Sequence, residues 1–526
     1  MTDIVICSIP RMSIYYPPAA PALLKASVEA YGFSATTIDF VIQFHDKYFG
    51  TDMWDRLDQW MVLETNDKQA YDIIKTETDL WAKQMLSHNP KWIGISIFSF
   101  ESHRIGKMLC MAIRKNCNKT RIVLGGAGIS GDAHNLGKSY KDNALCDEII
   151  SGDGERSIVQ LLQEEYSEGT DRLEDLNSWP FANFDDYNLD LYKANKKKSS
   201  DLNTDKKDVW QGYGNTWYRT EEILTLPLVG SRGCVRKCTF CDIPALWPRY
   251  VTRSAENISQ EVIKQYETHN VQRFHFTDSL INGNQKNFKN LAEILANYRA
   301  KTGADFTITG QYIVRNAEHE SQDYYHLLAS AGFKILEVGI ESGSEAVRWH
   351  MGKKFTNSDV EILLERLSKA NMMAILLLIV GYPTETQQDF EQTIDMLTKF
   401  KPYVDDGTII EATLGGTQHI DPGSALAKDP NIITSVDELG NVDVYNWRYT
   451  KNPDLTFKER IRRRLLIMEH AQSLNYLSPT NNQEIALLKK RWRALNESNT
   501  SSVSKNSTQQ RPQYTSENQQ AIGAQS

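Results

Sequence analysis

The chain has 526 residues, 40% of them hydrophobic and 24% charged, and a formal net charge of −8. This length favours two or three domains, each with enough apolar residues for a core. The acidic balance disfavours a non-specific nucleic-acid binder, and no apolar run reaches the roughly 20 residues that a membrane-spanning helix needs.

Residues 1–165 alternate short apolar runs with helical stretches. Strands are predicted at 3–9, 34–40, 91–98, 121–124 and 148–150, with a helical insertion over 51–89. Such alternation predicts a parallel sheet with helices on both faces, here a flavodoxin-like (Rossmann-type) α/β domain. Ligands of these sheets bind beyond the carboxyl ends of the strands, where glycine turns fall in this sequence.

The second half of the chain repeats the alternation after a less regular connector at 166–222. Over 223–430, strands are predicted at 223–230, 273–277, 305–314, 335–340, 373–380 and 408–413. Six strands with intervening helices predict a partial (β/α)6 TIM-like barrel, with its site at the carboxyl ends of the strands.

The C-terminal part is predicted to be a helical extension over 431–496, followed by a disordered polar tail over 497–526. The basic run 460–464 within the extension is expected to form a solvated helix face.

Three of the seven cysteines, Cys234, Cys238 and Cys241, are spaced Cys-x-x-x-Cys-x-x-Cys just after the first predicted barrel strand. Three thiolates on one short loop suit an iron–sulfur cluster or zinc. A structural zinc site needs a fourth ligand, and the possible donors His269 and His275 have no paired spacing to the cysteines. A [4Fe–4S] cluster leaves one iron open for another molecule, and this interpretation is favoured.

The loop 231–241 resembles the signature of the radical S-adenosylmethionine (SAM) superfamily, including Phe240 before the last cysteine. The resemblance implies that SAM chelates the open iron and is cleaved to a 5′-deoxyadenosyl radical. Later segments resemble superfamily motifs in the expected order: 276–279 ("DD", with Ser279 for an acidic residue), 338–344 ("GIESGS"), 379–386 ("GxPGET", with Thr384 for glycine) and 421–424 ("PGT"). The resemblance implies that SAM is bound by Phe240, Asp278, Glu341, Ser342, Gly381 and Tyr382.

Residues 1–165 resemble the cobalamin-binding domain that precedes the radical domain in one large subfamily, on the pattern of Pro17-Pro18, Gly125-Gly126 and the turn 152–155. An Asp-x-His-x-x-Gly motif is absent after the first strand, which removes an axial histidine and not necessarily the cofactor. The alternative is a domain that has lost its ligand and only shapes the substrate cavity. The resemblance implies cobalamin over the carboxyl ends of the strands, bound by Ser8, Ser96, Gly125, Gly126, Gly152 and Gly154.

As a whole, the resemblance implies a cobalamin-dependent radical SAM methyltransferase that acts on an unactivated carbon of a small-molecule or peptide substrate. Radical cyclisation, rearrangement or oxidation without methyl transfer is one alternative. A non-catalytic zinc-stabilised scaffold or nucleic-acid adaptor is the other. An electron donor such as flavodoxin or ferredoxin is an expected partner, and nucleic acid is not. The N-terminal segment has no secretion signal, so a cytoplasmic location is expected.

Overall fold

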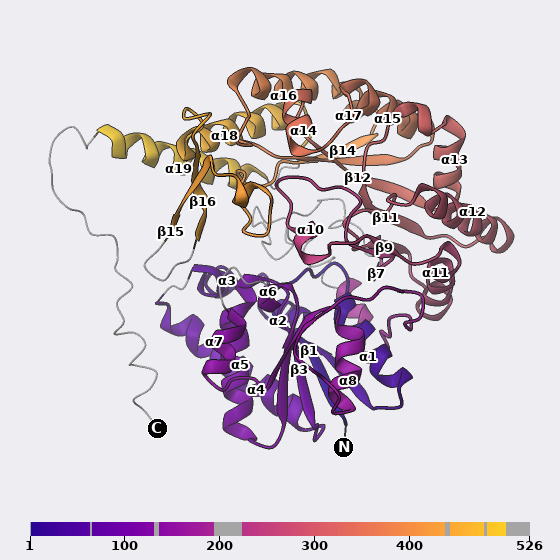
Figure 1. Ribbon diagram of the computed structural model, residues 1–526, viewed down its shortest axis with the longest axis vertical. Coiled ribbons are helices and arrows are strands. Elements are labelled where there is room, and N and C mark those ends of the chain that lie inside the picture. The colour runs from indigo at the N-terminus through magenta and orange to yellow at the C-terminus, as the bar shows by residue number, and fades with distance from the viewer. Residues whose placement is uncertain are drawn as a thin grey trace.

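The computed structural model describes residues 2–63, 66–130, 136–193, 223–436, 442–477 and 481–500. Two α/β domains lie against each other, with the N-terminal domain below and the barrel domain above in Figure 1. Within the described ranges, no helix is both long enough and apolar enough to cross a membrane.

The first domain is a six-stranded parallel sheet in the order β2-β1-β3-β4-β5-β6. The order of its first five strands is that of flavodoxin-like sheets, which confirms the predicted fold. All five residues of β1 are buried because helices cover both faces of the sheet. The strands are β1 (Ile4–Ser8), β2 (Ala35–Asp39), β3 (Trp92–Ser96), β4 (Arg121–Gly125), β5 (Glu148–Gly152) and β6 (Thr170–Asp171). The helices are α1 (Ala19–Ala30), α2 (Phe40–Tyr48), α3 (Trp54–Leu63), α4 (Lys68–Leu86), α5 (His103–Asn116), α6 (Ala127–Ser130), α7 (Leu136–Asp142) and α8 (Gly154–Leu162).

The predicted connector does more than link the two domains. Its β6 adds the sixth strand to the first sheet, and the Asp186 carboxylate accepts a hydrogen bond from Thr37 N–H at 2.7 Å. Ala182 N–H donates to Glu261 of the barrel domain at 3.1 Å. The stretch 166–193 therefore contacts both domains and holds them together. The rest of the connector, 194–222, lies outside the described residues.

The second domain is a six-stranded parallel sheet in the order β14-β13-β12-β11-β10-β7. No pairing joins β14 to β7 among the described residues, so the barrel is partial, as predicted. The strands are β7 (Thr225–Leu228), β10 (Arg273–Phe276), β11 (Thr307–Tyr312), β12 (Phe333–Glu341), β13 (Met373–Leu378) and β14 (Ile409–Thr413). The helices are α10 (Ile243–Leu246), α11 (Ala255–His269), α12 (Gln285–Thr302), α13 (Gln322–Ser330), α14 (Glu345–Met351), α15 (Asn357–Lys369), α16 (Gln387–Lys399) and α17 (Lys401–Asp405).

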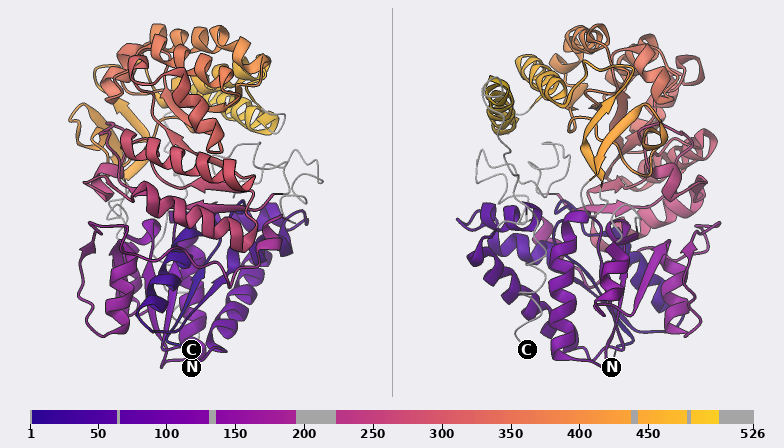
Figure 2. Two further views of the ribbon diagram at one scale, coloured as in Figure 1. Left: turned by 90° about the vertical axis from the view of Figure 1, so that its right-hand side faces the viewer. Right: turned by 60° about the vertical axis from the view of Figure 1, so that its left-hand side comes forward.

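The C-terminal extension differs from the predicted helical segment because it begins with an antiparallel hairpin. The hairpin pairs β15 (Ile432–Val436) with β16 (Val442–Tyr449), and α18 (Phe457–Ser473) and α19 (Asn482–Thr500) follow. Figure 2 shows these elements along one side of the barrel domain. The part of the predicted disordered tail from residue 501 lies outside the described residues.

Candidate functional site

The three clustered cysteines lie on a loop that follows β7 and is closed at its base by two short antiparallel strands, β8 (Ser231–Arg232) and β9 (Val251–Thr252). Gly233 enters the loop with a φ of 77°, and a Cβ there would lie 2.4 Å from the Arg249 carbonyl oxygen. Only glycine fits this turn without a shift of the backbone. The sequence therefore folds into a tight base that presents residues 234–241 together.

Asp278 fixes this base from the barrel side. Its Oδ1 accepts hydrogen bonds from the backbone N–H groups of Gly230 at 2.9 Å and Ser231 at 2.8 Å. Burial raises the pKa of Asp278 to about 7. Asp278 thus positions the cysteine loop in the structure, and its predicted contact with SAM stays a prediction.

The three thiols are free, with Cys238 buried and Cys234 and Cys241 partly exposed. Burial raises the pKa of each thiol, that of Cys241 to about 12, while the Lys353 ammonium acts against this rise at Cys234 and Cys238. Across the described ranges, no trio of Cys, His, Asp or Glu side chains already surrounds a metal position. Three thiols are soft donors, and this chemistry fits an iron–sulfur cluster.

The cysteine loop packs directly on α14 and on the predicted motif 379–386. Thr239 N–H donates to the Met351 carbonyl at 3.1 Å, and the Thr239 hydroxyl lies 2.7 Å from the Tyr382 hydroxyl. Tyr382 is buried and also lies 2.8 Å from Nδ1 of His350. Phe240 packs against the same apolar cluster as Tyr382. The structure thus brings Phe240 and Tyr382, 142 residues apart in sequence, to one place.

Glu341, at the end of β12, is the second acidic residue of the predicted site. It is buried, has a φ of 68°, and its Oε1 lies 2.6 Å from the Lys353 ammonium. A positive φ at a residue other than glycine is strained and often marks a functional position. Ser342 beside it is buried, and its hydroxyl lies 3.3 Å from that of Thr393. Lys353 was missed by sequence reasoning because no motif includes it.

Gly381 follows β13 with a φ of 77°, and its N–H donates to Glu385 Oε1 at 3.2 Å. Glu385 is buried and pairs with Arg463 of α18 at 2.9 Å. Burial raises the pKa of Glu385 to about 7, although Arg463 acts in the opposite direction. In the same segment, the Thr384 hydroxyl is buried without a hydrogen-bond partner among the described residues, which leaves a donor for a ligand.

The expectation that the run 460–464 is a solvated helix face was wrong for two of its arginines. Arg460 is 0% and Arg463 5% exposed. The Arg460 guanidinium donates to the Trp447 carbonyl at 3.1 Å and lies 3.8 Å from the centre of the Trp447 ring. Arg460 packs against Gly381, and Arg463 pairs with Glu385 of the same turn. Both arginines therefore support the Gly381 turn, although they are distant from it in sequence.

In the first domain, several predicted cobalamin residues have roles within the domain itself. The buried Ser8 hydroxyl donates to Asp39 at 2.8 Å. A Cβ at Gly126 would lie 2.5 Å from the Ile97 carbonyl oxygen, and one at Gly154 would lie 2.9 Å from Leu24. Gly152 has a φ of 91° and lies against the backbone of Asp171.

Two other predicted cobalamin residues, Ser96 and Gly125, lie partly exposed at the carboxyl ends of β3 and β4. A Cβ at Gly125 would meet nothing closer than 3.7 Å. Phe98, just beyond β3, is 59% exposed. This edge of the sheet is therefore open enough for a ligand to approach its backbone.

The same edge of the first domain meets the cysteine loop. The turn after β5 places Asp153 and Glu155 against Arg232, two residues before the first cysteine. After β1, Tyr16 stacks on His275 of β10 with ring centres 5.0 Å apart. The carboxyl ends of the first sheet thus face the barrel domain.

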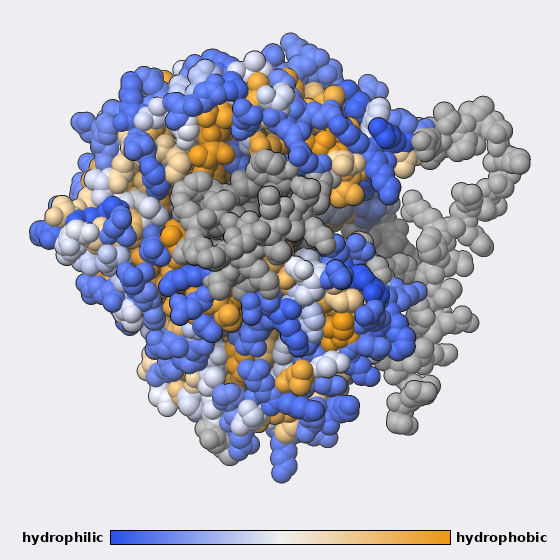
Figure 3. Space-filling model, turned by 180° about the vertical axis from the view of Figure 1, so that it is seen from behind, coloured by the Kyte–Doolittle hydropathy of each residue, from blue (hydrophilic) through white to orange (hydrophobic). Residues whose placement is uncertain are grey.

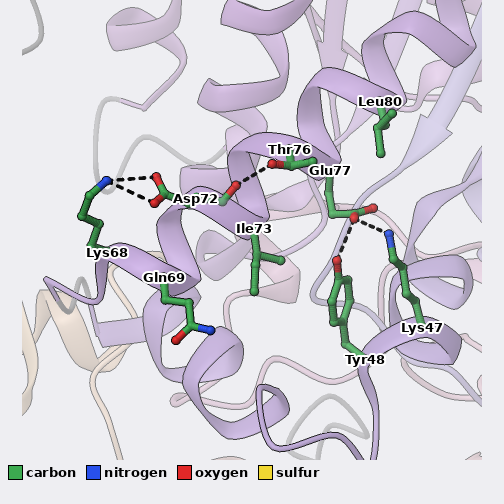
Figure 4. A pocket seen from close by; sticks show the side chains of 9 residues that line it. All are labelled: Lys47, Tyr48, Lys68, Gln69, Asp72, Ile73, Thr76, Glu77 and Leu80. Atoms are coloured by element: carbon green, nitrogen blue, oxygen red, sulfur yellow. Dashed lines mark hydrogen bonds and ion pairs between the residues drawn. The ribbon is translucent and has the colours of Figure 1, made fainter.

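A separate groove of about 610 Å³ lies on the outside of the first domain. Figure 4 shows that α2 and α4 supply its lining, with Glu77 bonded to Lys47 and Tyr48. None of the predicted site residues lines it.

On the face seen in Figure 3, apolar side chains of the described residues occur in small groups among hydrophilic ones, as is usual for folded proteins.

Comparison with known proteins agrees with this arrangement. Residues 228–397 match the Radical SAM superfamily, whose members use a [4Fe–4S] cluster and SAM. The chain is 22% identical over 306 residues to an anaerobic magnesium-protoporphyrin IX monomethyl ester cyclase from Synechocystis, covering 58% of each chain. It is 28% identical over 174 residues to a tRNA-2-methylthio-N(6)-dimethylallyladenosine synthase from Thermotoga petrophila, covering 32% of this chain and 38% of that protein. The chain thus spans less than two thirds of the length of these relatives.

Two solved structures share the fold over nearly the whole chain. TsrM, a radical SAM methyltransferase from Kitasatospora setae with cobalamin and a [4Fe–4S] cluster bound, superposes with a TM-score of 0.59 at 15% identity, covering 92% of this chain and 90% of that one. OxsB, a cobalamin-dependent SAM radical enzyme with aqua-cobalamin and SAM bound, gives 0.59 at 13% identity, covering 94% and 70%. Residues 228–397 form a radical SAM domain, and the chain shares its overall fold with the cobalamin-dependent radical SAM enzymes TsrM and OxsB.

Proposed function

We propose that this enzyme is a cobalamin-dependent methyltransferase that methylates an unactivated carbon of a small-molecule or peptide substrate. One observation carries the proposal: the carboxyl edge of the first sheet lies against the loop of Cys234, Cys238 and Cys241, through Arg232 and the turn after β5. Because ligands of flavodoxin-like sheets bind at this edge, a cofactor there would lie beside the cysteine loop.

In the barrel domain, Cys234, Cys238 and Cys241 would hold a [4Fe–4S] cluster. When bound, such a cluster with an open iron supplies the electron for reductive cleavage of SAM. The chain's own contribution is position: Tyr382 locks the loop to α14 through Thr239 and His350. The buried Glu341–Lys353 pair lies beside the thiols and offers a carboxylate and an ammonium to a zwitterionic cofactor.

In the first domain, Ser96, Gly125 and the exposed ring of Phe98 would face cobalamin, which supplies a carrier for the methyl group when bound. The open backbone at Gly125 and the exposed Phe98 support this assignment. Ser8, Gly126, Gly152 and Gly154 shape the edge through contacts within the domain.

The second candidate is radical cyclisation or oxidation without methyl transfer. It is favoured by the match to the Synechocystis cyclase, which extends over 306 residues. Both candidates share the cysteine loop and the SAM segments, and they differ in whether a methyl group leaves SAM for the substrate. An electron donor such as flavodoxin or ferredoxin is part of the proposal in either case.

The experiment is anaerobic reconstitution of the full chain with iron, sulfide and hydroxocobalamin, followed by desalting and analysis of iron, sulfide, cobalt and zinc. The methyltransferase proposal expects about four irons and four sulfides with about one cobalt per chain. Iron and sulfide without cobalt would leave the second candidate. Zinc without iron would contradict both.

A further inference from the structure

Two buried carboxylates and a partly buried guanidinium connect the first domain to the base of the cysteine loop. Arg232 Nη1 lies 2.8 Å from Asp153 Oδ1 and 3.1 Å from Glu155 Oε2, and Arg232 Nη2 pairs with the other oxygen of Glu155. The side chains are 16%, 2% and 6% exposed, respectively. A buried charge that loses its partner is strongly unfavourable, so this contact constrains both domains.

Asp153 also holds the far side of the same loop. Trp247 Nε1–H donates to Asp153 Oδ1 at 2.9 Å, and the other carboxylate oxygen accepts from Leu173 N–H at 2.6 Å. Arg232 precedes the first cysteine by two residues, and Trp247 follows the last one by six. One carboxylate of the first domain therefore bonds to both flanks of the segment that carries all three thiols.

The barrel domain holds the base of the loop by a separate contact, in which Asp278 accepts from Gly230 and Ser231. Ser231 and Arg232 are neighbours on β8, so the base is held between the two domains. If the first domain made no contact with the loop, Asp278 would still hold its base. Trp247, after the last cysteine, would then lose its hydrogen bond to Asp153.

We propose that Arg232 is a positioning residue through which the first domain, by its turn 152–155, fixes the cysteine loop in the form that binds SAM at the cluster. The identity of the bound groups rests on the proposed function. Arg232 itself would contact neither SAM nor the substrate. It acts by keeping residues 233–250 in a fixed conformation.

Four variants of the full chain test this role. Arg232→Met leaves two buried carboxylates unpaired, and Arg232→Lys keeps the charge without the two-pronged guanidinium. The exchange Arg232→Glu with Glu155→Arg keeps the net charge of the trio and rebuilds an ion pair. The matched control is Lys25→Met, which removes the pair of the buried Lys25 with Asp186 (2.6 Å) away from the cysteine loop.

The first readout, amide hydrogen exchange, needs no cofactor. Arg232→Met is expected to speed exchange in residues 233–250 about ten-fold or more, and Arg232→Lys to give a smaller increase. The charge exchange is expected to restore protection in part, because it re-forms the pair with residue 155 but places a carboxylate beside Asp153. Lys25→Met is expected to leave this segment unchanged, whatever its melting temperature. Equal loop exchange in Arg232→Met and Lys25→Met would overturn the proposal.

The second readout is SAM affinity of the reconstituted cluster, followed by the SAM-induced change in its electron paramagnetic resonance spectrum. Arg232→Met is expected to keep its iron but bind SAM about ten-fold more weakly, with partial recovery in the charge-exchanged variant. Unchanged affinity would overturn the proposal. If Arg232→Met does not fold, Arg232→Lys and the charge-exchanged variant decide by the same two readouts. A wild-type chain without a cluster would refute the proposed function, whereas the exchange result would still decide the role of Arg232.

Discussion

The backbone of Gly381 rests on the side chain of Arg460: a methyl group at residue 381 would lie 2.7 Å from Arg460 Cγ. Arg460 cannot easily move away, because its guanidinium is bonded to the Trp447 and Leu455 carbonyls and packed on the Trp447 ring. The turn predicted to bind SAM is thus supported by the C-terminal extension.

Gly381→Ala is expected to weaken SAM binding about ten-fold or more and to lower the free energy of unfolding by roughly 2–4 kcal/mol, since it combines overpacking with a positive φ. The matched control is Gly407→Ala. Gly407 has a φ of 81° and nothing within 4 Å of an added Cβ, so only the roughly 1 kcal/mol of backbone strain is expected. Titration of both reconstituted variants with SAM makes the comparison. Equal affinities would argue against this role for the Gly381 turn.

The buried Glu385 predicts a pH-dependent stability. Burial raises its pKa from 4.5 to about 7, so the folded state binds this proton more tightly than the unfolded state. Stability is therefore expected to fall as pH rises from about 4.5 to 7, by about 3 kcal/mol from this residue. Urea unfolding at pH 5 and 7.5 should show a weaker decrease in Glu385→Gln than in the wild type. The same pH dependence in both proteins would contradict this account.

Lys353 is expected to hold Glu341 in place for SAM. In Lys353→Met the Glu341 carboxylate loses its 2.6 Å partner, and we expect SAM affinity to fall about ten-fold. The adjacent Lys354 is exposed and supplies the control, because Lys354→Met removes the same charge from the surface. Isothermal titration under anaerobic conditions compares the two, and a similar small effect in both would exclude a specific role for Lys353.

Cys238→Ala is expected to abolish cluster assembly, with iron and sulfide falling to background after reconstitution. Cys117→Ala, at the end of α5 in the first domain, should retain wild-type iron and sulfide. Chemical analysis and the visible absorbance of both variants provide the test. Full iron content in Cys238→Ala would show that these cysteines are not the cluster ligands.

Much of the fold was predictable because its signals are local. Buried parallel strands are short apolar runs, as in β13, and the cysteine spacing lies within eight residues. The β15–β16 hairpin also had a readable signal, since residues 442–449 alternate apolar and polar side chains in part, but the charged helix after it dominated the interpretation.

The supporting contacts of the site were not predictable because each joins distant segments. Arg463 reaches Glu385 across 78 residues, and Arg232 reaches Glu155 across 77. A single arginine in a basic run has the same sequence pattern whether it is buried or solvated. Asp278 was recognised as a site residue, yet its bonds to the cysteine loop depend on the pairing of β7 with β10.

Cys234, Cys238 and Cys241 are expected to hold a cluster whose open iron binds SAM. Electron paramagnetic resonance of the dithionite-reduced, reconstituted chain, with and without SAM, tests it most directly. The expected result is the spectrum of a reduced [4Fe–4S] cluster that changes its g values when SAM is added, and neither signal in Cys238→Ala. A wild-type spectrum that SAM leaves unchanged would contradict it.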